Sequence, residues 1–369
     1  MKFTIEQKEL ATAISLVSRA VAKRPSRPIL GYILLEAAQG YISVTGFDEE
    51  VALTLKVPAE VEKPWRICLP ADLWGNIVSR LDSGALTMLQ PTNDATMTIT
   101  CGASYYEIRG LGAEDYPKLP EVKTTPFTLP VAVLRAGIES ALPFVSDDAT
   151  KQVLQGVNLL QQLGELRFAA TDGHRLSVQA ADSEGDDPLE VTIPGGALAL
   201  LDAHLKTCEA ADLVSIALDD VQGQFEIFGF RLVARILEGQ YPNYAQLIPA
   251  SFQREQAVPR QALIDALGRL SAVSTLVSNV IKVTLDSDKI TLTSDAKEAG
   301  NGSEVVPLEM GEPLDAITIG FNAKYLLEAL KVTAGAEVLI QCNTPTTPVV
   351  ISPLTGGQTN LIMPIQIRS

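Results

Sequence analysis

The segment from Phe230 to Pro249, FRLVARILEGQYPNYAQLIP, decides how this chain is organised, because a shortened copy of it occurs earlier. The earlier copy, YYEIRGLGAEDYPKLP, ends at Pro120, and both copies run from a strand through an acidic turn to Tyr-Pro and then to a second proline. Tyr-Pro begins at 116 and again at 241, an interval of 125 residues, and three such intervals nearly fill the 369 residues. The chain is therefore predicted to use one structural unit three times.

Two further patterns recur at about the same interval and in the same order. Apolar residues spaced four and seven apart, typical of an amphipathic helix, begin at Leu10, Leu134 and Leu263. Strand-forming runs that stop at a threonine before a polar turn end at Thr45, Thr171 and Thr293. Apolar periodicity alone is common in globular chains, but three patterns that recur together strengthen the prediction of a threefold repeat.

Each repeat is predicted to contain two helices and several strands. The helices are expected at 6–24, 70–81, 130–143, 194–207, 259–280 and 321–331. Short connections such as Asp172-Gly173, a pair typical of tight hairpins, favour antiparallel pairing of the strands. The predicted fold class is α+β, with two helices on one face of each antiparallel sheet. The three tandem domains are expected at 1–124, 125–249 and 250–369.

The composition is that of an ordinary folded protein, with 46% apolar and 20% charged residues. The sequence contains no run of 18 apolar residues that could span a membrane. The opening MKFTIEQKEL lacks the apolar centre of a signal peptide. The cysteines are scattered without a metal-binding spacing, at Cys68, Cys101, Cys208 and Cys342. We therefore expect a cytoplasmic protein with no metal, no cofactor and no membrane partner.

The sequence offers little for catalysis. It contains only two histidines, His174 and His204, and none of the common phosphate-binding, dinucleotide-binding or zinc-protease motifs. Asp172 and His174 leave a hydrolase open as an alternative, although turn geometry explains Asp-Gly and no nucleophile motif accompanies it. A sequence-specific DNA-binding regulator is a second alternative, but the predicted helices lack base-reading side chains. We favour a function without catalysis.

Charge is distributed unevenly along the chain. The net charge is −15, yet the six predicted helices together carry +4 and the remainder carries −19. The eleventh position of the second helix in each domain is basic in type, namely Arg80, His204 and Lys331. A helix of about twelve residues is about 18 Å long, which exceeds the width of the major groove of duplex DNA, about 12 Å. If such helices lie across the groove, they contact phosphates on both sides without reading bases. Three similar domains favour an arc, and two arcs joined head to tail can close into a ring.

Several motifs make the chain similar to a known family. They are MKFTIEQKEL at the start, RPSRPILG at 24–31, ATDGHRL at 170–176, EGQYPNY at 238–244, IGFNAKYL at 319–326 and LIMPIQI near the C-terminus. Over its whole length the chain resembles the bacterial sliding clamps, the beta subunits of the replicative DNA polymerase III. The resemblance implies the DNA clamp fold and a head-to-tail homodimeric ring around duplex DNA. It also implies a processivity factor that tethers the polymerase without acting chemically on DNA.

The resemblance further implies partners and sites. The partners are the catalytic subunit of DNA polymerase III, an ATP-driven clamp loader and other proteins that carry a clamp-binding peptide with glutamine and apolar side chains. The implied peptide pocket comprises Leu154, Thr171, Gly173, His174, Arg175, Leu176, Pro242, Leu247, Asn322, Tyr325, Thr346, Pro348, Leu361, Ile362, Met363, Pro364 and Ile365. For Leu154 and Leu176 a place in the core remains an open alternative.

DNA contact and dimerisation are assigned more sparsely. The residues expected to contact DNA are Lys23, Arg24, Arg27, Arg80, Lys151, His204 and Lys331. The family often has basic residues where this chain has Asp72, Gly195 and Gly196, which bears on the strength of DNA contact. The implied subunit joint places Tyr106 of one chain against Ala272 and Val273 of the other. Because those two side chains are small, we expect a dimer that opens more easily than one with larger aliphatic residues.

Overall fold

The computed structural model describes residues 2–91, 95–183, 188–274, 279–295, 300–309 and 315–367, without the side chains of 272–274 and 295. Its contacts divide the chain into two compact units. Unit 1 comprises Met1–Ala132 and Gly196–Ile236, and unit 2 comprises Val133–Gly195 and Leu237–Ser369. The two units are described separately.

The order of elements repeats three times along the described chain. Each third begins with a strand and a helix, continues with further strands and a second helix, and ends with three strands. The helices are α1 (Gln7–Val17), α2 (Ala71–Val78), α3 (Val131–Ala141), α4 (Gly195–Leu205), α5 (Arg260–Ser274) and α6 (Ala323–Val332). All six predicted helices are therefore present.

Most of the predicted helices are longer than the observed ones, and the first and fifth differ most. The first was expected to reach residue 24, but α1 ends at Val17 and gives way to a 3₁₀ turn at Ser18–Ala20. The Ser18 hydroxyl donates to the Ile14 carbonyl (2.7 Å), a local bond that competes with regular helix. The fifth was expected to reach residue 280, where the structure instead begins a strand. Apolar residues there fit both a helical and an alternating period.

Unit 1 contains two antiparallel sheets. The five-stranded sheet has the order β5 (Glu60–Val61), β1 (Lys2–Glu6), β7 (Ala85–Leu89), β8 (Thr96–Cys101) and β9 (Ser104–Arg109). The eight-stranded sheet has the order β10 (Phe127–Pro130), β15 (Leu213–Leu218), β16 (Gln222–Ile227), β17 (Phe230–Arg235), β4 (Val51–Pro58), β3 (Tyr41–Phe47), β2 (Tyr32–Ala38) and β6 (Trp65–Pro70). Pairing of β4 with β17 joins the first third of the chain to the second.

Unit 2 also contains two antiparallel sheets. The eight-stranded sheet has the order β14 (Leu189–Pro194), β11 (Gly156–Gln162), β12 (Glu165–Thr171), β13 (Arg175–Asp182), β25 (Gln358–Ile362), β24 (Val349–Pro353), β23 (Glu337–Cys342) and β18 (Arg254–Pro259). The four-stranded sheet has the order β21 (Asn301–Pro307), β20 (Lys289–Asp295), β19 (Val280–Leu285) and β22 (Ile317–Asn322). Pairing of β13 with β25 joins the second third to the last.

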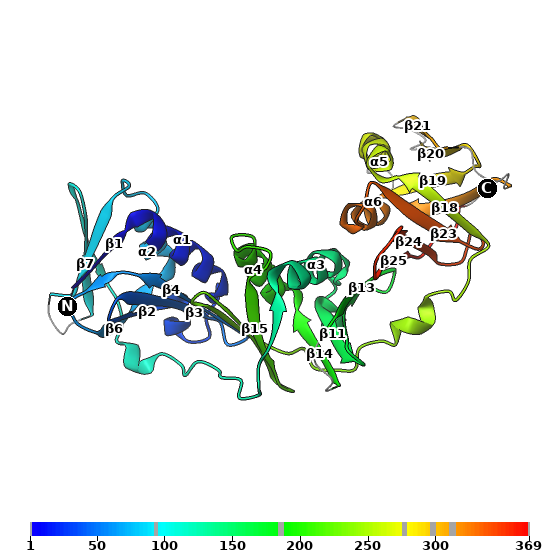
Figure 1. The fold of residues 1–369 in the computed structure, drawn as a ribbon. Helices are drawn as coiled ribbons and strands as arrows, with labels where there is room; N and C mark the ends of the chain where they lie inside the picture. The colour runs from blue at the N-terminus through cyan, green and yellow to red at the C-terminus, as the bar shows by residue number, and fades with distance from the viewer. Residues whose placement is uncertain are drawn as a thin grey trace. The chain divides into compact units, whose positions relative to one another are not determined.

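Helices α1 and α5 each pack between two sheets, which corrects the expectation of two helices on one face of a single sheet. In unit 1, α1 lies beside α2 and contacts β1 of one sheet and β3 and β4 of the other (Figure 1). In unit 2, α5 lies beside α6 and contacts β20 and β21 of one sheet and β18 and β23 of the other. The apolar side of α1, with Leu10, Ile14 and Val17, is fully buried in this way.

The same backbone bridge recurs in each third of the chain, so the repeat seen in the sequence is also a structural repeat. Cys68 and Leu111 exchange two hydrogen bonds of 2.9 Å, Leu237 N donates to Thr192 O (2.9 Å), and Ile365 N donates to Gly320 O (2.8 Å). A Cβ on Gly320 would lie 2.4 Å from the Ile365 oxygen, so only glycine fits there. These positions recur at close to the 125-residue interval read from Tyr-Pro.

The tyrosines of the two Tyr-Pro pairs are both buried and both bind the backbone of β-strands. The Tyr116 hydroxyl donates to Thr45 O (3.3 Å), and the Tyr241 hydroxyl accepts from Thr171 N (3.1 Å). The predicted threonine stops are right only for Thr171, because β3 continues to Phe47 and β20 to Asp295. The Tyr-Pro pair therefore marks a point where a loop is fixed to a neighbouring strand.

Candidate functional site

The implied peptide pocket is centred on the hairpin that joins β12 to β13 in unit 2. Asp172 Oδ1 accepts from the backbone N–H groups of His174 (2.8 Å) and Arg175 (3.1 Å), and Gly173 has φ +94°. The Thr171 hydroxyl donates to Arg175 O (2.6 Å) and accepts from Gly173 N (3.1 Å). The prediction of an Asp-Gly hairpin is confirmed. The side chain of Asp172 serves the turn, so the geometry does not favour the hydrolase alternative.

The Arg175 side chain is buried and binds several elements at once, so it is not a surface cation. Its guanidinium pairs with Asp172 (Nε to Oδ2, 2.9 Å) and with Glu328 of α6, and it donates to Pro143 O (2.6 Å). It also lies over the rings of Tyr325 (4.3 Å to the centroid) and Phe144 (5.0 Å). Arg175 therefore fixes the hairpin to α6. No local feature of the sequence indicates Glu328 as its partner, because the two residues are far apart in the chain.

The C-terminal segment runs beside this hairpin. Strand β25 pairs with β13 so that Ile362 is opposite Arg175, and Met363 N donates to His174 O (2.9 Å). Of the predicted residues 361–365, the first three are thus brought to the hairpin, whereas Ile365 binds Gly320. Thr346 and Pro348 lie between β23 and β24, just before Val349, which pairs with Ile362.

Burial separates the predicted pocket residues into two groups. Leu176, Leu361 and Ile362 are at most 1% exposed, so they belong to the core, as do Thr171 and Arg175. Leu154 is half-buried and packs on the same apolar cluster, which includes Tyr241 and Tyr244. The structure therefore places Leu176 in the core and Leu154 at its edge.

Five exposed residues of the predicted set define what we call the hairpin surface, namely Gly173, His174, Pro242, Leu247 and Met363. Leu247 is 51% exposed and Met363 39%. Neighbours of Leu247 pack into the same apolar cluster as Leu154, which keeps this loop beside the hairpin. Exposed apolar side chains over a rigid, hydrogen-bonded base suit the docking of an apolar peptide side chain.

Two predicted border residues have structural tasks. The Asn322 side chain caps α6 by accepting from Lys324 N (3.0 Å) and Tyr325 N (3.4 Å). Burial, and secondarily the charge of Asp172, raises the pKa of Tyr325, which keeps its hydroxyl neutral beneath Arg175.

Val153 and Ile248 were not predicted to belong to the pocket, yet they pack on the apolar cluster that includes Tyr241 and Tyr244. Their apolar character next to Leu154 and Leu247 was the available signal.

Most residues predicted to contact DNA are exposed. They are Lys23, Arg24, Arg27, Arg80, Lys151 and Lys331. Arg27 already pairs with Glu49 (2.8 Å), and Lys151 Nζ donates to Asp172 O (3.0 Å). Arg80 lies two residues beyond α2, whereas Lys331 occupies the last turn of α6.

His204 departs from the expected recurrence of a basic group. Its ring stacks on Phe230, with 4.2 Å between ring centroids and an interplanar angle of 6°. Burial lowers its pKa, and its buried Nε2 has no hydrogen-bond partner among the described residues. The ring is therefore neutral at pH 7 and adds no positive charge to α4.

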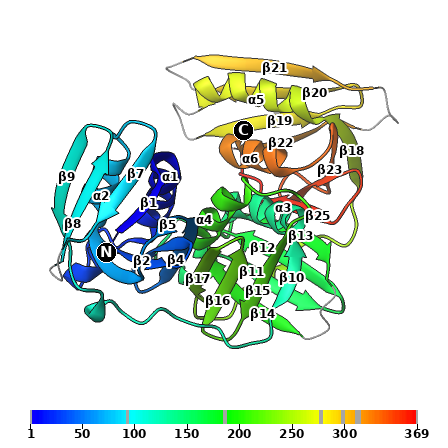
Figure 2. The same cartoon turned by 60° about the vertical axis from the view of Figure 1, so that its left-hand side comes forward.

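The predicted subunit joint involves a strand edge in unit 1 and the end of helix α5 in unit 2. Tyr106 lies on β9, at the edge of the five-stranded sheet of unit 1, and is 43% exposed. Figure 2 shows β9 at that edge and β21 at an edge of the four-stranded sheet of unit 2. Ala272 and Val273 fall at the end of α5, where the side chains are outside the described residues.

The described residues contain no cluster of three histidine, cysteine, aspartate or glutamate side chains that could hold a metal ion. Within the same residues, every helix is too short or too polar to cross a membrane.

Comparison with known proteins identifies the family. Models of the N-terminal, central and C-terminal domains of the DNA polymerase III beta subunit match residues 1–120, 128–243 and 245–366. The beta sliding clamp of Synechococcus elongatus is 40% identical over 379 residues, covering all of both chains, and that of Bacillus subtilis is 30% identical over 380 residues, covering 99% of this chain and all of the other. The crystal structure of the DNA polymerase sliding clamp from Bacillus subtilis superposes with a TM-score of 0.92 at 28% identity over both full chains. The chain therefore belongs to the DNA polymerase III beta subunits, the bacterial DNA sliding clamps.

Proposed function

We propose that this sliding clamp works without catalysis, as a ring of two chains that encloses duplex DNA and holds the polymerase on it. The observation that carries the proposal is the repeated pairing of strands between thirds of the chain. Strand β17 pairs with β4, and β25 pairs with β13. The strand equivalent to β17 and β25 in the first third is β9, and the strand equivalent to β4 and β13 in the last third is β21.

Strands β9 and β21 thus carry the two halves of a pairing that the chain makes twice within itself. Each lies at the edge of its sheet, and each exposes apolar side chains, Tyr105 (63%) on β9 and Val305 (57%) on β21. Unpaired edges of this kind are templates for another strand. Two chains pairing β9 with β21 at both ends form a closed, head-to-tail dimer.

The repeat also predicts the register of this joint. Phe230, the first residue of β17, pairs with Leu55, and the equivalent residues by strand position are Ser104 and Glu304. Continuing antiparallel from that pair sets Tyr106 opposite Gly302. A glycine there leaves room for the tyrosine ring across the strands.

Cysteine cross-linking tests the register. Directly opposed residues have Cα atoms about 4.5–5.5 Å apart, within the range that a disulfide bridges. A chain carrying Tyr106→Cys and Gly302→Cys is expected to oxidise to a covalent dimer. A matched chain with Tyr106→Cys and Glu304→Cys has its cysteines two residues out of register. We expect it to form no disulfide and to run as a monomer under denaturing, non-reducing conditions. Equal cross-linking in both chains contradicts the register.

Retention on DNA tests encirclement itself. A loaded, cross-linked ring is expected to remain on nicked circular DNA at high salt and to leave after the circle is linearised, because a ring slides off a free end. Non-specific phosphate contact instead weakens steeply with salt on both forms of DNA. Loss from circular and linear DNA at the same salt concentration contradicts encirclement, whereas sedimentation reports the dimer independently.

DNA contact and partner docking complete the proposal. We assign weak phosphate contact to Lys23, Arg24, Arg27, Arg80, Lys151 and Lys331, because all six are exposed. We assign docking of the polymerase, the clamp loader and other partners with clamp-binding peptides to the hairpin surface, where Leu247 and Met363 offer apolar contact.

The boundaries of the three domains remain a proposal, at 1–124, 125–249 and 250–369. A cytoplasmic location is proposed as well, and the four unpaired cysteines agree with a reducing compartment.

A further inference from the structure

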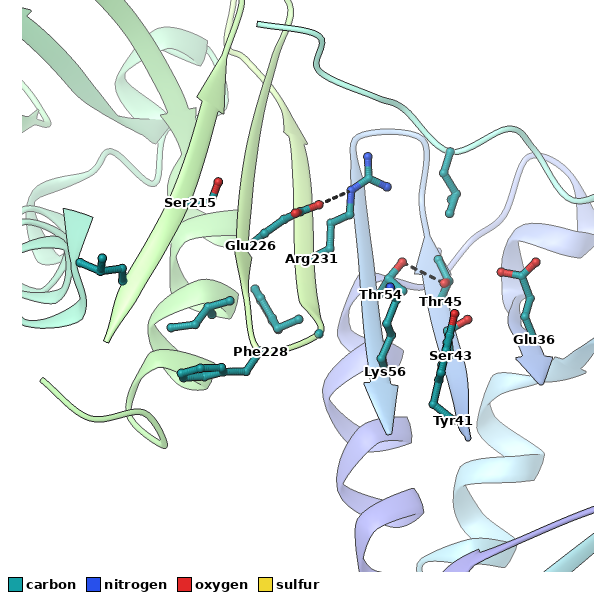
Figure 3. Close-up of a pocket in the computed structure, with 15 residues that line it drawn as sticks. Glu36, Tyr41, Ser43, Thr45, Thr54, Lys56, Ser215, Glu226, Phe228 and Arg231 are labelled. Carbon is teal, nitrogen blue, oxygen red and sulfur yellow. Dashed lines mark hydrogen bonds and ion pairs between the residues drawn. The ribbon is translucent and has the colours of Figure 1, made fainter. Parts of the chain in front are cut away.

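A cavity of about 630 Å³ lies in unit 1, on the face of the eight-stranded sheet where β4 and β17 meet. Figure 3 shows its polar side chains, among them Thr45, Thr54 and Lys56 from one side of that joint and Glu226 and Arg231 from the other. None of the lining residues belongs to the hairpin surface or to the strand edges described above. Its chemistry is therefore a separate question from the proposed ring.

The cavity exists because unit 1 lacks a tyrosine that fills the equivalent place in unit 2. Tyr244, three residues after Tyr241, is buried in a cluster with the cross-strand pair Ala169 and Val178. In unit 1 the residue three after Tyr116 is Leu119, which is smaller and lies at the cavity wall. The strand pair below it is Thr45 and Thr54, whose hydroxyls are 2.9 Å apart. Polar side chains thus replace an apolar floor that the same fold can build.

Two opposite charges stand on this floor without a partner. Glu36, Ser43 and Lys56 are neighbours across three strands, which separates the two charged residues by about 10 Å. Lys56 lies over the Tyr41 ring (5.4 Å to the centroid), and neither it nor Glu36 has an ion-pair partner among the described residues. The other two charges of the cavity, Arg231 and Glu226, neutralise each other at 3.1 Å.

An exposed aromatic ring also lines the cavity. Phe228 occupies the turn between β16 and β17 with φ +46°, a conformation that a bulky residue rarely adopts, and is 72% exposed. Lys56 N donates to the oxygen of the next residue, Gly229 (3.0 Å), and the side chains of Lys56 and Phe228 both line the cavity. Asparagine would fit this turn with less strain. Neither the turn nor the core requires an aromatic ring there.

We propose that this cavity binds a short peptide segment of a partner protein in which an acidic residue is followed by a large apolar residue. The carboxylate pairs with Lys56, and the apolar side chain packs on Phe228 and the exposed Leu213. The unpaired Glu36 repels a polyanion, which disfavours single-stranded nucleic acid as the occupant. The site is a second docking position of the clamp, independent of the hairpin surface.

The test uses the full-length protein and three end-blocked hexapeptides, Gly-Ser-Asp-Phe-Ser-Gly, Gly-Ser-Lys-Phe-Ser-Gly and Gly-Ser-Asp-Ser-Ser-Gly, titrated by calorimetry and by ligand-observed NMR. We expect the Asp-Phe peptide to bind about fivefold more tightly than the Lys-Phe peptide, the effect of one partly exposed ion pair. The Asp-Ser peptide, which lacks the apolar group, is expected to bind about tenfold more weakly than the Asp-Phe peptide.

Two variants assign the contacts. Lys56→Glu is expected to reverse the preference, so that the Lys-Phe peptide binds more tightly than the Asp-Phe peptide. Phe228→Asn keeps a residue that tolerates positive φ, so its Tm is expected to equal or exceed that of the parent while Asp-Phe binding falls about tenfold. The proposal is overturned if the parent binds the Asp-Phe and Lys-Phe peptides equally or binds neither. It is overturned as well if Lys56→Glu leaves the preference unchanged or if Phe228→Asn binds the Asp-Phe peptide as the parent does.

Discussion

Two hairpins, one in each unit, have the same backbone and different side chains. In unit 1, Asp48 Oδ1 accepts from the N–H groups of the two residues that follow the turn, as Asp172 Oδ1 does in unit 2. The next residue has positive φ in both, +79° at Glu49 and +94° at Gly173. The incoming strand is bound alike, since Arg235 N donates to Glu50 O (2.8 Å) and Met363 N donates to His174 O (2.9 Å).

The side chains at these equivalent positions make different surfaces. The unit 1 hairpin is acidic and is covered by the ion pairs Arg27–Glu49 (2.8 Å) and Arg235–Glu50 (3.9 Å). The unit 2 hairpin carries His174 and the exposed Met363, with Arg175 buried beneath. One backbone design therefore supports a charged, closed surface in one place and an apolar, open one in the other. We therefore expect the proposed docking of an apolar peptide to depend on these side chains and not on the repeated fold.

The largest expected difference between the two hairpins is in stability. Arg175→Ala removes a buried guanidinium and leaves Asp172 and Glu328 without their shared partner. Breaking a buried ion pair from one side costs about 3–5 kcal/mol. We expect the urea midpoint of unit 2 to fall strongly, as followed by circular dichroism and hydrogen exchange.

The matched control is Arg235→Ala in unit 1, whose ion pair with Glu50 is exposed. An exposed pair is worth about 0–1 kcal/mol, so the urea midpoint should barely move. Equal losses for the two variants would mean that the buried position of Arg175 is energetically unimportant.

Exchanging one side chain between the hairpins tests the docking role. Met363→Arg installs the residue that unit 1 has at this position, and its N–H bond to His174 does not depend on the side chain. We expect a labelled peptide with one glutamine and two leucines to bind about tenfold more weakly by fluorescence anisotropy, because an apolar contact is replaced by a hydrated charge. The reciprocal Arg235→Met should leave this affinity unchanged. An unaltered affinity in Met363→Arg would place peptide docking elsewhere.

The sequence predicted the repeat well because its signals are local. Tyr-Pro at 116 and 241 and the Asp-Gly hairpin at 172–173 depend on backbone preferences of a few neighbouring residues, and the structure has both features where expected. Helix ends were less predictable, since the residues before Val280 fit a helix and a strand equally.

Contacts between residues distant in sequence were the main omission. No residue near Arg175 in the sequence indicates its ion pair with Glu328. Likewise, no residue near His204 indicates that its ring stacks on Phe230, where burial keeps it neutral at pH 7. The sharing of sheets between thirds was missed for the same reason, because the pairing of β4 with β17 joins segments that have no local signal for each other. Which pocket residues are core, as Leu176 is, depends likewise on the pairing of β13 with β25.

The two buried tyrosines provide a smaller and more closely matched comparison. Tyr241→Phe leaves Thr171 N, a buried donor, without its partner, which costs about 1–2 kcal/mol. Tyr116→Phe removes a longer bond to a carbonyl, Thr45 O (3.3 Å), and should cost less, about 0.5–1 kcal/mol. Thermal unfolding of the two variants measures the difference. A larger loss for Tyr116→Phe would show that the two Tyr-Pro loops are not fixed in the same way.

The smallest expected effect is a pH dependence confined to unit 1. Phe230, the first residue of β17, is covered by the His204 ring, whereas the equivalent Gln358 of β25 donates to Val332 O (3.0 Å). Burial lowers the pKa of His204 below its ordinary value of 6.5, so the unfolded chain binds the proton more readily than the folded one. Stability from this group is complete above pH 6.5 and declines as the pH falls toward the folded pKa.

His204→Gln should therefore narrow the loss of Tm between neutral and mildly acidic solution. His174→Gln, which changes the exposed histidine of the unit 2 hairpin, serves as the control and should leave that loss as it is in the parent. Melting curves of the parent and of His204→Gln that shift in parallel with pH would show that the stacked ring takes up its proton as easily in the folded chain as in the unfolded one. In that case the stacked ring would be charged in mildly acidic solution, and α4 would carry its positive charge there despite the contact with Phe230.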